Sequence, residues 1–83
     1  MKYKVLIRLY VPEIEEKYEM YIPVNEYVGK LANNLSDFVH KISKVYPAKK
    51  NARMYDRWTG LVFNEQAIIR DCNILNGSEI VLI

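Results

Sequence analysis

IIRDCNILNGSEIVLI, residues 68–83, is the stretch of sequence that decides the fold. It begins with an irregular part, in which we expect Ile69 and Ile74 to face inward, and ends in a run rich in β-branched residues, Glu79 to Ile83. Asn76-Gly77 stands between the two parts and supplies the positive φ that a tight turn needs. Because such a terminal run needs neighbouring strands, the remaining chain is expected to build the sheet that receives it.

Length and composition are those of one small globular protein. The chain has 83 residues, and we expect residues 1–83 to form a single domain. Hydrophobic residues make up 51% and charged residues 27%, well away from the composition of disordered chains. One cysteine cannot form an internal disulfide, so nothing indicates an oxidising compartment. With no signal-peptide pattern and no apolar run long enough to span a membrane, we expect a cytoplasmic protein.

Two segments near the N-terminus alternate apolar and polar residues, as strands with one buried face do. In residues 3–11 the expected inward face is Tyr3, Val5, Ile7, Leu9 and Val11. In residues 17–24 it is Tyr18, Met20 and Ile22. The charged residues between the two segments predict a turn, and the pair is expected to form a hairpin.

From Val28 onward the apolar residues recur at helical spacing instead. The expected stripe is Val28, Leu31, Ala32, Leu35, Val39 and Ile42. Asn25 is expected to cap the start of this helix, and Pro47 stops its continuation. Gly29 costs up to about 1 kcal/mol of helix propensity relative to alanine, so the helix depends on packing its stripe.

The chain after the helix is predicted to return to the sheet. Ala52 to Trp58 is expected to be a third strand, Thr59-Gly60 a turn, and Leu61 to Phe63 a short return strand. This order of elements predicts an α+β fold, a mixed sheet of four to five strands packed on one amphipathic helix. The helical crossover permits the first and last strands to lie side by side and parallel. This is the β-grasp, or ubiquitin-like, arrangement.

These elements resemble ubiquitin, and the sequence is more similar still to the small ubiquitin-like YukD proteins of bacterial type VII secretion. The matching features are Pro23-Val24 before the helix, the Val62-Phe63 pair, and Asp71-Cys72, Ile74 and Asn76-Gly77 ahead of an aliphatic run. The match covers most of the chain and is specific from about Met54 onward. It implies a non-catalytic, protein-binding accessory or regulatory component of the secretion machinery.

The resemblance also leaves an alternative of another class, a ubiquitin-like modifier or sulfur carrier. Such proteins use a flexible tail ending in Gly-Gly, whose carboxylate is adenylated. This sequence ends in Ile80-Val81-Leu82-Ile83, so we expect neither conjugation nor sulfur transfer.

No catalytic set, phosphate-binding glycine loop or metal-ligand spacing is present in the sequence. His40, the only histidine, falls away from the apolar stripe and is expected to be exposed. Cys72 is expected to act as a small buried hydrophobic residue, and Asp71 to accept hydrogen bonds from nearby backbone amides. We therefore expect no enzymatic activity, no metal and no cofactor.

The candidate site is a surface on the third strand. Arg53, Tyr55 and Arg57 should share the face opposite Met54, and Trp58 follows beside the turn. Arginine and aromatic side chains are enriched in protein-binding hot spots. The four residues Arg53, Tyr55, Arg57 and Trp58 therefore predict a site for a protein partner.

Two further interpretations concern the same surface. In the first, Trp58 folds over the sheet edge and shields it from solvent. In the second, Lys49 and Lys50 join the surface and the protein is an RNA-binding regulator, although its net charge is only +2. The charges also separate along the chain, which predicts either two electrostatic poles or two solvated faces. Glutamates come first (Glu13, Glu15, Glu16, Glu19 and Glu26) and cations later (Lys41, Lys44, Lys49, Lys50, Arg53 and Arg57).

Overall fold

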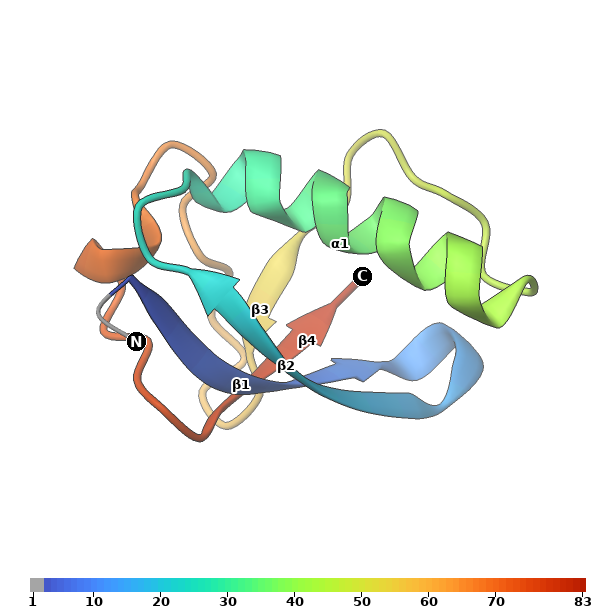
Figure 1. The fold of residues 1–83 in the computed structure, drawn as a ribbon, viewed down its shortest axis with the longest axis horizontal. Coiled ribbons are helices and arrows are strands. Elements are labelled where there is room, and N and C mark those ends of the chain that lie inside the picture. The colour runs from blue at the N-terminus through green and yellow to red at the C-terminus, as the bar shows by residue number, and fades with distance from the viewer. Residues whose placement is uncertain (1–2) are drawn as a thin grey trace.

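The structure, a computed structural model, describes residues 3–83. Within them, four strands and one α-helix follow the expected order (Figure 1). Their bounds are β1 Lys4–Val11, β2 Glu16–Pro23, α1 Val28–Ser43, β3 Met54–Asp56 and β4 Ser78–Leu82, with short 3-10 helices at Pro12–Ile14 (η1) and Ile69–Asp71 (η2).

The sheet has the strand order β2-β1-β4-β3. β1 pairs antiparallel with β2 and parallel with β4, and β4 pairs antiparallel with β3. The predicted parallel pairing of the first and last strands is therefore confirmed, with Leu9 opposite Ile80. In Figure 1 the helix lies across one face of the sheet and leaves the other face uncovered. The fold is the predicted mixed sheet packed on one helix, a β-grasp.

The turn ahead of β4 attaches that strand to β1. The Leu6 N–H donates to the side-chain oxygen of Asn76 at 2.8 Å, and the Gly77 N–H donates to the Leu6 carbonyl at 2.7 Å. Gly77 has a φ of 89°, a value at which a side chain would be strained. These bonds start the parallel ladder and set its register.

The hydrophobic core lies between the sheet and the helix. Five inward-facing side chains of β1 and β4 are completely buried: Ile7, Leu9, Val11, Ile80 and Leu82. The expected inward position of Tyr3 is wrong, because this residue precedes β1 and is 65% exposed. The helix contributes Val28, Leu31, Ala32, Leu35 and Val39. The expected burial of Ile42 is wrong: its side chain is 46% exposed, because it lies roughly 60° around the helix from Val39, on one flank of the stripe.

The third strand and the return strand are shorter than predicted. β3 covers three residues, and the expected strand Leu61–Phe63 is reduced to an isolated bridge between Val62 and Tyr55. The Asp56 carboxylate accepts hydrogen bonds from the amides that follow it, which bends the chain and ends β3 after so few residues. The described sheet therefore has four strands, the lower of the two expected numbers.

The start of the helix is capped by backbone groups, so the expected Asn25 cap is wrong. The N-cap residue is Tyr27, and the amides of Val28 and Gly29 donate to carbonyls of residues 67 and 65 at 2.9 Å each. A Cβ at Gly29 would lie 3.2 Å from the Glu65 carbonyl oxygen. The glycine thus permits a close approach of two backbone segments, which explains its place in a helix. No helix within residues 3–83 is long and apolar enough to cross a membrane.

Tyr46, in the loop between α1 and β3, is a core residue with 0% exposure. Its N–H donates a hydrogen bond to Ser43 Oγ at 3.0 Å, and its carbonyl oxygen lies 2.6 Å from His40 Nδ1. Lys49 lies above the ring, 5.3 Å from its centroid, and pairs with Glu13 of the hairpin turn. The loop after the helix is therefore held against the core by one large aromatic side chain.

Tyr46 supplies a first testable prediction. Its hydroxyl has no protein partner within residues 3–83, so Tyr46→Phe removes no hydrogen bond and should change the free energy of unfolding by about 1 kcal/mol or less. Tyr46→Ala empties the ring site and should cost about 3–5 kcal/mol. Urea denaturation of both variants checks the two values, and an equal loss in both would contradict a packing role.

Candidate binding surface on the outer face of the sheet

Backbone hydrogen bonds place three of the four candidate residues on one face. The Arg53 N–H donates to the Ile83 carbonyl at 2.8 Å, and the Ile83 N–H donates back at 2.9 Å. Tyr55 lies opposite Val81. The Arg57 N–H donates to the carbonyl of Glu79, two residues further along β4. Because this ladder is regular, Arg53, Tyr55 and Arg57 share the outer face, opposite the buried Met54.

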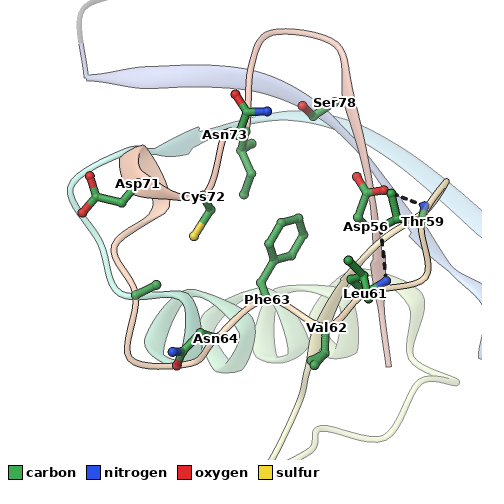
Figure 2. Close-up of a pocket in the computed structure, with 12 residues that line it drawn as sticks. Asp56, Thr59, Leu61, Val62, Phe63, Asn64, Asp71, Cys72, Asn73 and Ser78 are labelled. Carbon is green, nitrogen blue, oxygen red and sulfur yellow. Dashed lines mark hydrogen bonds between the residues drawn. The ribbon is translucent and has the colours of Figure 1, made fainter.

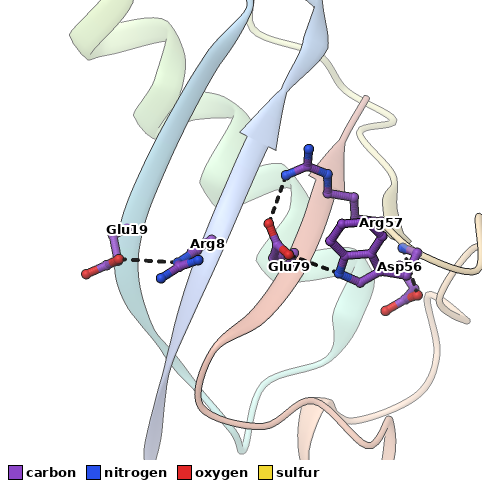
Figure 3. Close-up of polar contacts among 6 residues, drawn as sticks. Arg8, Glu19, Asp56, Arg57 and Glu79 are labelled. Atoms are coloured by element: carbon purple, nitrogen blue, oxygen red, sulfur yellow. Dashed lines mark hydrogen bonds and ion pairs between the residues drawn. The ribbon is translucent and has the colours of Figure 1, made fainter.

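Glu79 brings Arg57 and Trp58 together. Its Oε1 accepts a hydrogen bond from Arg57 Nη1 at 2.8 Å, and its Oε2 accepts one from the Trp58 indole N–H at 2.9 Å. Figure 3 shows the Glu79 carboxylate on β4 with the Arg57 guanidinium beside it. Both oxygens of a single carboxylate are thus used to orient two neighbouring side chains.

Aromatic rings flank the Arg57 guanidinium. Its central carbon lies 5.2 Å from the Trp58 ring centroid and 5.3 Å from that of Tyr10 on β1, distances at which cation–π attraction acts. Lys17 of β2 lies 5.9 Å from the same Tyr10 ring. The outer face therefore carries a connected layer of cations and aromatic rings from strands distant in sequence.

Trp58 is oriented but not buried. Its side chain is 74% exposed at the rim of the sheet, although its indole N–H is bonded to Glu79. The indole presents a large apolar surface in a defined direction. Because the Trp58 side chain is already oriented, it loses little conformational entropy when a partner binds.

A turn anchored by Asp56 holds Trp58 in place. Asp56 Oδ2 accepts hydrogen bonds from the amides of Trp58 at 3.2 Å and Thr59 at 2.8 Å, and the Asp56 carbonyl accepts one from Gly60 at 2.9 Å. Gly60 has a φ of 73°, as the tight turn requires. The hydrogen bonds from Thr59, and then that from Trp58, hold the pKa of the Asp56 carboxyl below its usual range.

The lowered pKa gives a pH-dependent prediction. Because the folded-state pKa of Asp56 lies below the unfolded value of about 3.9, its carboxylate stabilises the fold above that pH and loses this contribution as the pH falls through the folded pKa. Asp56→Asn should therefore be less stable than the wild type at pH 7, with the difference shrinking below about pH 4. Thermal unfolding from pH 7 to pH 2 measures it, and a constant difference would rule out a role for the charge.

Sequence reasoning missed the partners of the four candidate residues, above all Glu79 and Tyr10. A usable signal was present: Ile80 and Leu82 are inward-facing, so Glu79 and Val81 had to point outward. Their apposition to Arg8 and Tyr10 depends on the register of the parallel pair, which periodicity alone does not contain.

A pocket of about 510 Å³ lies between the turn after β3 and the segment after η2. Figure 2 shows Phe63 and Cys72 projecting into it, with Asp56 and Thr59 at one end and Asp71 at the other. Cys72 Sγ donates to a backbone carbonyl at 3.3 Å, and burial raises the pKa of the thiol, so it stays protonated near neutral pH. Cys72 packs against the core, as expected, but is only half-buried.

The remaining chemistry-bearing residues are separate from one another. Asp71 is exposed, and within residues 3–83 its carboxylate accepts no hydrogen bond, so the expected cap at this position is wrong. His40 is exposed, as predicted, and bonds to the Tyr46 carbonyl. In the described part of the chain no cluster of three or more histidine, cysteine or acidic residues could hold a metal ion.

The two expected charge poles partly neutralise each other. Glu13 in η1 pairs with Lys49, and this hydrogen bond raises the pKa of the lysine. On the outer face Arg8 pairs with Glu19 at 3.5 Å. The Glu13–Lys49 pair therefore joins the early acidic group to the later cationic group at one point of the folded chain.

The comparisons with known proteins address the fold. No protein-family model matches the sequence, and no curated protein matches it either. A chain from the toluene 4-monooxygenase HD complex with the inhibitor 4-bromobenzoate superposes with a TM-score of 0.79 at 10% identity, over 95% of both chains. The ubiquitin-like domain of the Mycobacterium tuberculosis type VII secretion protein ECCD1 superposes with a TM-score of 0.74 at 8% identity, over 96% of this chain and 97% of that one.

A ubiquitin from Caldiarchaeum subterraneum matches with a TM-score of 0.69 at 16% identity, over 96% of this chain and 91% of that one. The chain has a ubiquitin-like fold. At such low identities the ubiquitin-like neighbours show the architecture, a helix on a mixed sheet, and nothing about what the surface binds.

The Glu79 cluster can be tested without a partner. Trp58 is the only tryptophan, so its fluorescence reports on this site alone. Glu79→Ala removes the acceptor of the indole N–H, and we expect stronger quenching of Trp58 by acrylamide because the ring gains freedom. The free energy of unfolding should fall by about 1 kcal/mol or less, since the pair is partly exposed to solvent. Glu79→Gln keeps an acceptor for the indole and should show intermediate quenching.

Proposed function

We propose that this chain is one non-catalytic ubiquitin-like domain, residues 1–83, that binds a protein partner through the outer face of its sheet. We further propose that it acts in the cytoplasm as an accessory or regulatory component of bacterial type VII secretion. No metal or cofactor takes part in this function. Arg53, Tyr55, Arg57 and Trp58 form the contact surface, with Glu79 and Tyr10 positioning two of them.

One observation carries the binding proposal: the exposed Trp58 indole is held in a single orientation beside Arg57 on an otherwise uncovered sheet face. Tryptophan and arginine are the residues most enriched among interface hot spots. An anchor that is already ordered in the free protein does not lose that freedom on binding. The geometry thus supports a protein contact more than a solvated face.

The secretion role rests on two separate resemblances. The sequence features from about Met54 onward resemble YukD proteins, and ubiquitin-like domains of type VII secretion are among the structural neighbours. Besides ECCD1, a chain of a MycP5-free ESX-5 inner membrane complex superposes with a TM-score of 0.78 at 9% identity, with 20% of that chain covered. Both neighbours belong to secretion assemblies, which supports an accessory role of the same kind.

A second candidate function is an accessory subunit of a multi-component oxygenase. It is favoured by one observation, the match to the chain of the toluene 4-monooxygenase complex over 95% of both chains. The proteins that co-purify with the tagged chain from its native host separate the two candidates. A membrane ATPase and small helical secreted proteins support secretion, whereas oxygenase subunits support the second function.

The other two alternatives are less well supported by the geometry. Lys49 is paired with Glu13 and Arg57 with Glu79, so two cations that RNA phosphates would need are already neutralised. Binding to RNA would weaken steeply between low and physiological salt. A modifier or sulfur carrier would instead give covalent adducts, which intact-mass spectrometry of the chain from native cells would detect.

The test of the proposed surface is a pull-down of co-encoded proteins with the double variant Arg57→Glu, Trp58→Ala. We expect recovery of the partner to fall at least tenfold, because the variant removes the indole and places a second negative charge beside Glu79. Unchanged recovery with the fold intact would contradict the proposal.

A matched control is the double variant Lys41→Glu, Tyr27→Ala. It makes the same change of charge and removes one exposed aromatic ring on the helix side of the molecule. This control should bind as the wild type does. Equal losses in both double variants would mean that the charge change, and not the outer face, determines binding.

A further inference from the structure

The two edges of the sheet differ. β3 has three residues and is followed by a turn whose Val62 bridges back to Tyr55, so little of its edge is open. β2 has eight residues, and within residues 3–83 only β1 pairs with it. A long edge strand is a template for pairing with another strand.

The hydrogen-bond pattern shows which groups of β2 are free. The Val24 N–H donates to the Tyr3 carbonyl in the register of the hairpin, so every second residue of β2 from Val24 back to Glu16 bonds to β1. The backbone groups of Lys17, Glu19 and Tyr21 therefore point away from the sheet. Their side chains lie on the outer face.

An apolar flank of the helix lies above this edge. Asn33 and Ser36 hydrogen-bond residues 52 and 49, in the segment that leads to β3 at the far edge. Phe38 and Ile42 lie roughly 120–180° around the helix from them, on the flank toward β2. They are 45% and 46% exposed.

A second copy of this chain fits both features. A two-fold axis normal to the sheet would pair β2 with the partner's β2, antiparallel, and would place both helices on the same face with their apolar flanks toward each other. Such an isologous contact uses the same surface on both copies. Directly opposite residues of an antiparallel pair point to the same face of the sheet, and side chains alternate along each strand. The inner faces of the two copies therefore lie on the same side only if the two-fold axis passes through a residue of β2 and not between two residues.

The two-fold axis can pass through Tyr18, Glu19 or Met20 at the centre of β2, and the residues that each choice sets opposite one another decide among them. An axis at Glu19 sets this carboxylate directly opposite the partner's Glu19, which is unfavourable. An axis at Met20 sets Lys17 opposite the partner's Pro23, which has no N–H to donate. An axis at Tyr18 sets Lys17 opposite the partner's Glu19 twice, with the free backbone groups of both residues facing each other.

We propose that two copies of this chain pair antiparallel along β2, with the two-fold axis at Tyr18, and form one continuous sheet. Lys17 of each copy lies beside the partner's Glu19, and Arg8 flanks that glutamate from its own side at 3.5 Å. The charges alternate across the junction as cation, anion, cation. This contact leaves the Arg57–Trp58 surface free, so a dimer would present two copies of the proposed site.

Charge reversal tests the pairing. In analytical ultracentrifugation of the full chain, Lys17→Glu and Glu19→Lys should each weaken self-association at least tenfold, because each places like charges opposite each other. An equal mixture of the two variants should recover the dimer, since the mixed pair restores opposite charges at both positions. Lys41→Glu, with the same charge change as Lys17→Glu on the exposed side of the helix, should dimerise as the wild type does.

Disulfide trapping tests the register. In a Cys72→Ser background, Tyr18→Cys should form a disulfide-linked dimer on oxidation, because residues at the axis of a non-hydrogen-bonded pair lie about 4.5 Å apart. Met20→Cys should not. Far-ultraviolet circular dichroism confirms that each variant is folded.

Two results would overturn the proposal. One is a wild-type protein that stays monomeric up to about 1 mM, far above the range in which standard-sized specific interfaces bind. The other is a mixture of Lys17→Glu and Glu19→Lys that dimerises no better than either variant alone. Trapping through Met20→Cys in place of Tyr18→Cys would overturn the register.

Discussion

The parallel pairing of β1 with β4 is the interaction on which the rest of this structure depends. It joins the two ends of the chain, and it starts where Asn76 and Gly77 bond to the backbone of Leu6. Once β4 lies beside β1, Leu9 and Ile80 become neighbours in the core, and β3 has a strand to join. Contacts between residues so distant in sequence carry a large loop-closure cost, which the burial of both inner faces offsets.

The same pairing builds the outer face. Parallel register puts Glu79 beside Arg8 and Val81 beside Tyr10, and the antiparallel ladder to β3 then brings Arg57 next to Glu79. A single carboxylate can therefore orient both a guanidinium and an indole that come from a short strand and its turn. The surface that we propose for binding a partner is a consequence of the core arrangement, because side chains on opposite faces of a strand share one register.

The polar contacts explain why charge along the sequence was a poor guide to charge on the surface. Glutamates of the hairpin meet cations from the loop after the helix and from β1. Folding thus pairs Glu13 and Glu19 of the hairpin with cations, and the uncovered sheet face carries aromatic rings beside the Arg8–Glu19 and Arg57–Glu79 pairs. A surface of this composition suits contact with another protein better than contact with a polyanion.

The sequence by itself determined the class of fold, the inner faces of β1, β2 and β4, and most of the helical stripe, since alternation and helical periodicity are local properties that burial imposes residue by residue. It also predicted that Arg53, Tyr55 and Arg57 share a face. Only the tertiary structure decided the burial of Tyr46, the backbone cap of the helix and the joining of Arg57 and Trp58 through Glu79. Each of these depends on a contact between segments far apart in the chain, and no local pattern records which segments will meet.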